Sequence, residues 1–228
     1  SGNRYVIEDC EFQEGAGRQL GHDGGSTSTV NRCIFNAGGD AYLPDPNAVN
    51  NITTTNSIFF DAGGRIRSEN CCNPNEPRAY IFRHCTFVDD NGGNSIFQAP
   101  GFTDPSTFDN CLFDMPMHAV IMGEGSATST APLGGVNMRD GDTVDATDAT
   151  PGLVAGGDLG LDAAARLTAD SRGPINAAPD IGVTDDVDGS PRPSATTGCP
   201  PNEAAGPDVG AHEYQADDVV CDDEPPTI

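Results

Sequence analysis

Apolar and polar residues alternate over short stretches in the first half of the chain, and one such stretch recurs five times. Each copy contains a polar residue, a cysteine or serine, any residue and a phenylalanine. The cysteine or serine lies at positions 10, 33, 57, 85 and 111, so successive copies are 23, 24, 28 and 26 residues apart. Glycine-rich turns separate the copies, and a repeat of about 20 to 30 residues of this kind predicts a solenoid of stacked β-coils. The five copies are YVIEDCEF (5–12), STVNRCIF (28–35), TTTNSIFF (53–60), YIFRHCTF (80–87) and STFDNCLF (106–113).

The same alternation predicts which side chains of each copy form the core. Residues i and i+2 of a strand point to one side of the sheet, so the cysteine or serine and the phenylalanine are expected to face inward. The residue between them is expected to face solvent, as is the polar residue before the cysteine, which is His84 in the fourth copy. Thiols buried in such a column act as small apolar groups, so we expect no catalytic residue among them. The two expected core columns are Cys10, Cys33, Ser57, Cys85 and Cys111, and Phe12, Phe35, Phe59, Phe87 and Phe113.

The fold class predicted by this pattern is all-β, a parallel β-helix of about five or more coils. A leucine-rich horseshoe is the competing solenoid, but the leucine and asparagine repeat of that fold is missing. The coils are expected to occupy residues 1–122. Residues 123–228 are expected to form a long irregular loop, a terminal coil and a tail within the same domain, with a short helical turn over 160–168.

Eight cysteines in a chain of 228 residues indicate an oxidising compartment, and hence a secreted protein. No paired CxxC motif is present, so a structural zinc site is not expected. Cys199 and Cys221 lie near the end of the chain, and a disulfide between them would close a tail loop. We favour this pairing for the C-terminal region, and a bridge between the adjacent Cys71 and Cys72 is the weaker alternative.

The charge of the chain limits its partners. The 35 acidic and 11 basic residues give a net charge of −24, and all the basic residues are arginine. Such a chain repels nucleic acid and anionic membranes. No apolar run approaches the roughly 20 residues of a membrane helix, so membrane insertion is not expected either.

Calcium is the one cofactor that the acidity indicates, and no organic cofactor is expected. Aspartates at alternating loop positions beside a glycine can supply several of the oxygen ligands that calcium requires. The alternative interpretation is that the acidity only keeps a secreted protein soluble. The candidate ligands are Asp140, Asp142 and Asp145 in the long loop, and Asp186, Asp188 and Asp208 near the C-terminus.

Two C-terminal motifs carry a resemblance to a known family. DVDGSPR (186–192) and DVGAHEY (208–214) match the pattern D-x-D-G-x-x-R followed by D-x-G-A-x-E-[YF]. This end of the chain resembles the terminal coil of secreted bacterial right-handed parallel β-helix repeat proteins of the choice-of-anchor Q type. The resemblance implies a right-handed β-helix on a secreted or surface protein, and the family carries no single activity. At the motifs themselves, we expect Glu213 or Asp208 to pair with Arg192 and fix the terminal turn.

Two functions are compatible with this sequence. The first is an extracellular structural or adhesive module, which self-associates into a filament or meets a neighbouring domain at its N-terminal coil. Because the chain opens directly on strand-like sequence, a signal peptide and a preceding domain are expected upstream. The second is a polysaccharide lyase or carbohydrate-binding module for acidic glycans. Since lysine is absent, its candidate catalytic or anion-binding residues are Arg65, Arg67 and Arg83.

Overall fold

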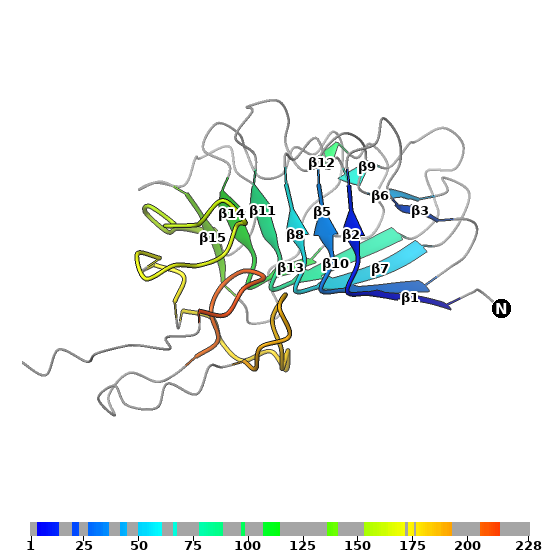
Figure 1. The fold of residues 1–228 in the computed structure, drawn as a ribbon. Coiled ribbons are helices and arrows are strands. Elements are labelled where there is room, and N and C mark those ends of the chain that lie inside the picture. The colour runs from blue at the N-terminus through cyan, green and yellow to red at the C-terminus, as the bar shows by residue number, and fades with distance from the viewer. Residues whose placement is uncertain are drawn as a thin grey trace, which may run out of the picture.

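The sequence repeat folds into parallel strands that lie in three sheets (Figure 1). Within the part of the chain that the computed structural model describes, no residue is helical and every ladder between strands is parallel. The described residues are 4–13, 20–22, 27–36, 42–44, 50–60, 66–67, 78–88, 97–98, 107–114, 136–140, 153–171, 173–175, 177–192 and 206–214.

Each sheet takes its strands from successive copies of the repeat, in chain order. Sheet A consists of β1 (Arg4–Glu8), β4 (Thr27–Asn31), β7 (Asn50–Thr55), β10 (Arg78–Arg83) and β13 (Thr107–Asp109). Sheet B consists of β2 (Glu11–Phe12), β5 (Ile34–Phe35), β8 (Ile58–Phe59), β11 (Thr86–Val88), β14 (Leu112–Asp114), β15 (Asn137–Arg139) and β16 (Leu153–Ala155). Sheet C consists of β3 (Leu20–His22), β6 (Tyr42–Pro44), β9 (Ile66–Arg67) and β12 (Phe97–Gln98).

The strands pair in the register of the sequence alignment. Sheet A pairs Glu8 with Asn31, Asn31 with Thr55, Thr55 with Arg83, and Arg83 with Asp109. Sheet B pairs the phenylalanines of successive copies. Their rings stack face to face with centroids 4.7, 4.7, 4.8 and 5.1 Å apart along the series Phe12, Phe35, Phe59, Phe87 and Phe113. The spacing matches the separation of neighbouring strands, about 4.8 Å, so the ring column follows directly from the strand register.

The cysteine positions form a second buried column beside the rings. Cys33, Ser57, Cys85 and Cys111 are fully buried, whereas Cys10 and Phe12 of the first coil are only partly buried. Each of these cysteines or serines donates its side-chain hydrogen to the carbonyl oxygen two residues earlier, at distances of 2.8 to 3.5 Å. A small side chain with a donor therefore suits this position, and serine meets the requirement as well as cysteine does.

The chain turns from sheet A to sheet B at one residue of each copy, directly before the cysteine or serine. Here φ lies between 48° and 55°, a left-handed conformation that asparagine, aspartate and histidine adopt more readily than most residues. We call these positions the corner residues: Asp9, Arg32, Asn56, His84 and Asn110. The expectation that His84 lies on the surface is wrong, because this side chain is fully buried, as are those of Asn56 and Asn110.

Two further expectations for the chain after residue 122 need correction. The stretch expected to be an irregular loop contains β15 and β16, which extend sheet B by two strands. The expected helical turn over 160–168 is instead a tight reversal, closed by an antiparallel bridge between Leu161 and Leu167. In both places the sequence lacks the repeat motif, and pairing with preceding strands or residues sets the conformation.

The last part of the chain covers the outer face of sheet B. We call its described residues, 156–171, 173–175, 177–192 and 206–214, the C-terminal segment. Leu112 of β14 packs with Leu159, Leu167 and Val209 in one apolar cluster. A second cluster joins Ile58 of β8 to residues of the same segment: Ala165, Val187 and Ala211. The central residue of the CxF motif was expected to face solvent, but in the third, fourth and fifth copies it is buried under this segment.

The cysteines that the structure describes, Cys10, Cys33, Cys85 and Cys111, carry free thiols. The proposed disulfide between Cys199 and Cys221 and the alternative between Cys71 and Cys72 fall in ranges that are not described, so both stay predictions. None of the described residues belongs to a helix long and apolar enough to span a membrane.

Candidate functional site

The C-terminal segment is attached along the line of corner residues. Asp185 accepts hydrogen bonds from Arg32 at 2.5 Å and from the amide of Asn56 at 3.2 Å, and so bridges the second and third copies. Arg32 also holds Asp9 of the first copy through two bonds of 2.6 and 2.9 Å. These hydrogen bonds from the guanidinium lower the pKa of Asp9 below its usual value. One arginine therefore ties the first coil to the C-terminal segment.

His84 is the corner residue at the centre of this attachment. Its Nδ1 lies 3.1 Å from the carbonyl oxygen of Asp208, and its Nε2 lies 3.0 Å from the side-chain amide nitrogen of Asn110. The neutral ring with its proton on Nδ1 satisfies both contacts, because Nδ1 then donates and Nε2 accepts. Burial, reinforced by the nearby positive charge of Arg192, lowers the pKa of His84 to about 3. His84 is therefore a neutral structural contact at physiological pH.

Within the segment, a fully buried ion pair joins Arg192 to Glu213, whose charged atoms are 3.0 Å apart. The guanidinium also donates to the carbonyl oxygens of Asp185, Asp208, Gly210 and Ala211 at 2.6 to 3.1 Å. All five of its N–H groups are thereby used, which is what a buried arginine requires. This arrangement provides the pairing expected for the terminal motif, with Glu213 as the partner. We call Arg192, Glu213 and the carbonyl oxygens around them the clasp.

A glycine lets the end of the segment approach sheet B closely. Gly210 has φ of +100°, and a Cβ at this position would lie 2.8 Å from Oγ1 of Thr86 and 3.1 Å from Cβ of Leu112. The next residue, Ala211, donates its backbone N–H to Oγ1 of Thr86 at 2.9 Å. Any side chain at position 210 would therefore separate the segment from β11 and β14, the two strands that it covers here.

Among the described residues, Asp186, Asp188 and His212 form a cluster that could hold a metal ion. One potential ligand atom from each lies within 4.8 Å of the others. Asp186 already accepts three backbone hydrogen bonds, from Asp188, Ser190 and Glu213, at 2.7 to 3.0 Å. Asp188 accepts two from the guanidinium of Arg166, at 2.6 and 2.7 Å. These bonds from Arg166 lower the pKa of Asp188.

This cluster does not fit calcium. Calcium takes about 6 to 8 oxygen ligands. The cluster offers one imidazole nitrogen and two carboxylates, both of which already accept hydrogen bonds from the protein. Arg166 already supplies a positive charge to Asp188, so a cation bound to this carboxylate would have to displace the arginine side chain. Burial also lowers the pKa of His212, which keeps the ring neutral beside Asp188 at a distance of 3.8 Å.

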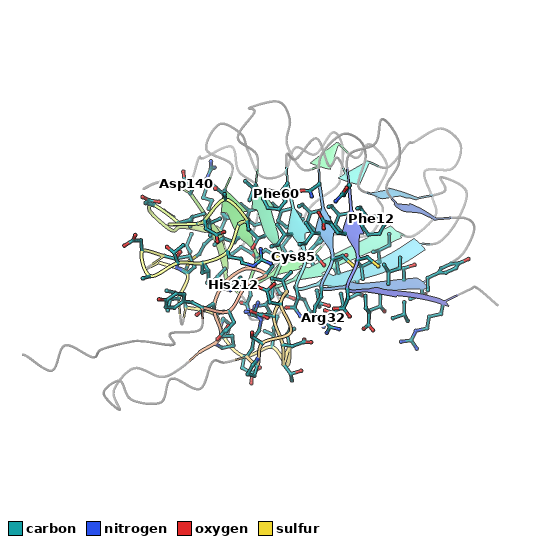
Figure 2. All side chains as sticks on the ribbon, viewed as in Figure 1. Phe12, Arg32, Phe60, Cys85, Asp140 and His212 are labelled. Atoms are coloured by element: carbon teal, nitrogen blue, oxygen red, sulfur yellow. The ribbon has the colours of Figure 1, made fainter. Side chains whose placement is uncertain are left out.

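The two other expected ligands that the structure describes, Asp208 and Asp140, do not belong to this cluster. Asp208 uses its carboxylate to accept the backbone N–H of Tyr214 at 2.6 Å. Asp140 follows β15 and lies well away from His212 (Figure 2). Asp142 and Asp145 lie outside the described residues, so calcium binding in that loop stays a prediction.

The arginines of the lyase hypothesis are not assembled by any described contact. Arg83 lies at the end of β10, with its Nε 3.9 Å from the buried carboxylate of Asp109 on the neighbouring strand. Arg67 is in β9, where only the backbone is described, and Arg65 lies outside the described ranges. Arg83 is thus one half of a cross-strand ion pair, and the proposed group of three stays untested.

Sequence reasoning missed most of the residues that attach the C-terminal segment. His84 and Asn110 share their place in the repeat with Asp9 and Asn56, and this recurrence of residues that favour positive φ was a usable signal for a corner. Arg166 and Asp185 gave no comparable signal, because neither belongs to a repeated motif. Comparison of the chain with family models, curated proteins and solved structures gives no match.

Proposed function

We propose that this chain is a right-handed parallel β-helix that acts as a structural or adhesive module outside the cell or at its surface. The observation that carries the proposal is that charged groups of the C-terminal segment bind other groups of the protein. Asp185 holds this segment to Arg32 of the coils, and Arg192 and Glu213, both fully buried, hold two parts of the segment to each other. These groups stabilise one rigid shape, as a scaffold requires.

The closed helix is the finer part of this proposal. Successive copies supply one strand to each of sheets A, B and C in turn, up to β12. A chain that visits three parallel sheets in a fixed order encloses an interior, and the stacked phenylalanines fill it. Crossover connections between parallel strands are right-handed in about 98% of cases, which supports the right-handed form.

The extracellular location follows from the composition and from the resemblance to choice-of-anchor Q proteins. The net charge of −24 and the absence of lysine suit a soluble surface without nucleic acid partners. Calcium belongs to the proposal only through the loop that starts at Asp140, because Arg166 already neutralises the cluster around Asp188.

The location can be tested with an antibody raised against the purified chain. We expect the antibody to label intact cells of the source organism or to detect the protein in the culture medium. Detection only after cell lysis would overturn the proposed function.

A second assay addresses the lyase alternative. The purified chain is incubated with uronic acid polysaccharides, and the absorbance of unsaturated products is followed in the ultraviolet. We expect no product. Turnover that is lost in Arg83→Ala would replace the structural role with an enzymatic one.

A further inference from the structure

The two ends of the stacked coils differ. At the start, β1, β2 and β3 are the edge strands of sheets A, B and C, and each pairs on one side only within the described residues (Figure 1). At the other end of sheet A, all three residues of β13 are buried. The side chain of Asn137, in β15, also bonds to this end of the coils. It accepts the backbone N–H of Cys111 at 3.0 Å and donates to the carbonyl oxygen of Phe108, in β13, at 2.8 Å. Of the two end strands of sheet A, β1 and β13, the described residues therefore leave only β1 exposed.

The core is also less covered at the first coil. Ile7, Cys10 and Phe12 are only partly buried, although the residues paired or aligned with them in the second copy are 0–1% exposed. Val6 and Tyr5 of β1 are 57% and 43% exposed. Exposed edge strands of this kind pair readily with another strand, which would also cover the apolar groups beside them.

The sequence of β1 is complementary to itself in the antiparallel direction. The strand reads Arg-Tyr-Val-Ile-Glu over residues 4 to 8. If two copies pair antiparallel about Val6, Arg4 of each copy lies opposite Glu8 of the other, on the outer face of the sheet. Tyr5 then lies opposite Ile7 on the inner face, and Val6 lies opposite Val6. Every cross-strand pair is favourable, and the two ion pairs are equivalent by symmetry.

We propose that β1 is the contact of a two-fold dimer in which the first coils of two copies meet end to end. A head-to-tail filament would require an open edge at both ends of sheet A, and β13 does not provide one. The inference deepens the proposed function, on which its biological meaning rests, because it limits self-association of the module to a pair. Two chains of charge −24 repel each other, so the dimer is expected to need ordinary salt, about 0.15 M, for screening.

The test uses sedimentation velocity of the full chain over a range of concentrations in such salt. Glu8→Arg and Arg4→Glu, made separately, place like charges opposite each other twice in the dimer. Each variant should weaken dimerisation at least about tenfold. Asp170→Arg changes the net charge by the same amount as Glu8→Arg, but at an exposed position of the C-terminal segment, and it should leave the dimer unchanged.

Mixing the two single variants is the decisive measurement. One variant then presents two positive and the other two negative side chains on β1, so the mixed dimer should form more strongly than the dimer of either variant alone. Recovery on mixing also shows that both variants are folded. A wild-type chain that is monomeric at every concentration, or a mixture that stays monomeric, would overturn the inference. Neither result depends on where the protein is located, so the proposed function and this inference can fail separately.

Discussion

At the scale of single residues, the corner between sheets A and B explains the repeated motif. A residue with positive φ turns the chain, and the next side chain donates to the carbonyl oxygen two residues earlier. Arginine is unusual at such a corner, because a left-handed backbone costs a residue with a long side chain about 1 kcal/mol. At Arg32 the ion pairs with Asp9 and Asp185 offset this cost.

Ser57 tests the role of the side-chain donor at the corner. Its hydroxyl donates to the carbonyl oxygen of Thr55 at 2.8 Å and accepts the backbone N–H of Cys33 at 3.2 Å. Ser57→Ala leaves that buried N–H without its acceptor, and we expect a loss of about 1 to 3 kcal/mol in the free energy of unfolding. Ser57→Cys restores the residue of the other copies and should cost clearly less. Urea denaturation compares the two variants, and equal losses would contradict this account of the corner.

His84 makes the stability of the fold depend on pH. Its pKa is about 3 in the folded chain and about 6.5 in a solvated one. Because the folded value is the lower one, the stabilisation is complete above about pH 6.5 and is lost as the pH falls towards 3. The expected slope reaches about 1.4 kcal/mol per pH unit between these values.

The control for this prediction is His84→Asn, which has the residue found at the corners of the third and fifth copies. The variant should be less stable at pH 7.5, because the contact with Asp208 is lost, but its stability should fall less steeply between pH 6.5 and 4. His212 is present in both proteins and cancels in the comparison. Parallel curves from urea denaturation would show that His84 does not titrate in this way.

At the scale of elements, the C-terminal segment is a cover that replaces solvent on the outer face of sheet B. Its apolar residues bury Ile58 and Leu112, while Asp185 attaches it to the corner residues Arg32 and Asn56. The apolar contacts are not directional, whereas the ion pair between Arg192 and Glu213 is. The clasp therefore fixes the conformation of the segment itself, the bonds of Asp185 to Arg32 and Asn56 fix its position on the coils, and the apolar surface supplies most of the favourable free energy.

Glu213→Gln tests the clasp. Removing one partner leaves the charge of Arg192 buried without compensation, and we expect a loss of about 3 to 5 kcal/mol in the free energy of unfolding. The matched control is Asp188→Asn, which breaks the ion pair with Arg166 in the same segment. Because Asp188 is 41% exposed, this change should cost less than about 1 kcal/mol. Similar losses in the two variants, measured in urea, would contradict the role given to the clasp.

At the scale of the whole molecule, the open question about the acidity is whether any of it binds a metal. A ligand that binds only the folded chain raises its stability by about 2.7 kcal/mol at a hundredfold excess over Kd. Screening of the −24 charge also stabilises the fold, but it neither saturates at a site nor distinguishes calcium from magnesium. The two effects can therefore be separated experimentally.

We expect the melting temperature to rise saturably with calcium at fixed ionic strength, and to rise more than with matched sodium or magnesium. Asp142→Asn combined with Asp145→Asn should abolish the rise. Asp188→Asn should leave it intact, because Arg166 occupies that carboxylate. If calcium acts no differently from sodium and magnesium, the acidic residues only provide a solvated surface.

The repeat in the sequence predicts the coil period, the strand register and the two inner columns of side chains. These features depend on local alternation, which recurs in every copy, so each copy supports the same interpretation of the others. The pairing of Arg192 was also expected, although only through a motif that resembles a known family. The period of the repeat thus contained most of the information about the coils.

The outside of those coils, in contrast, could be described only from the folded chain. Alternation assigns a side chain to one face of a sheet, but it does not say whether that face meets water or another segment. His84, Ile58 and Leu112 point outward as the pattern predicts, and all three are buried because residues more than 40 positions later fold back over them. Contacts between segments without a shared period leave no regular trace in the sequence, so the cover over sheet B and its attachment at the corner residues could be found only in three dimensions.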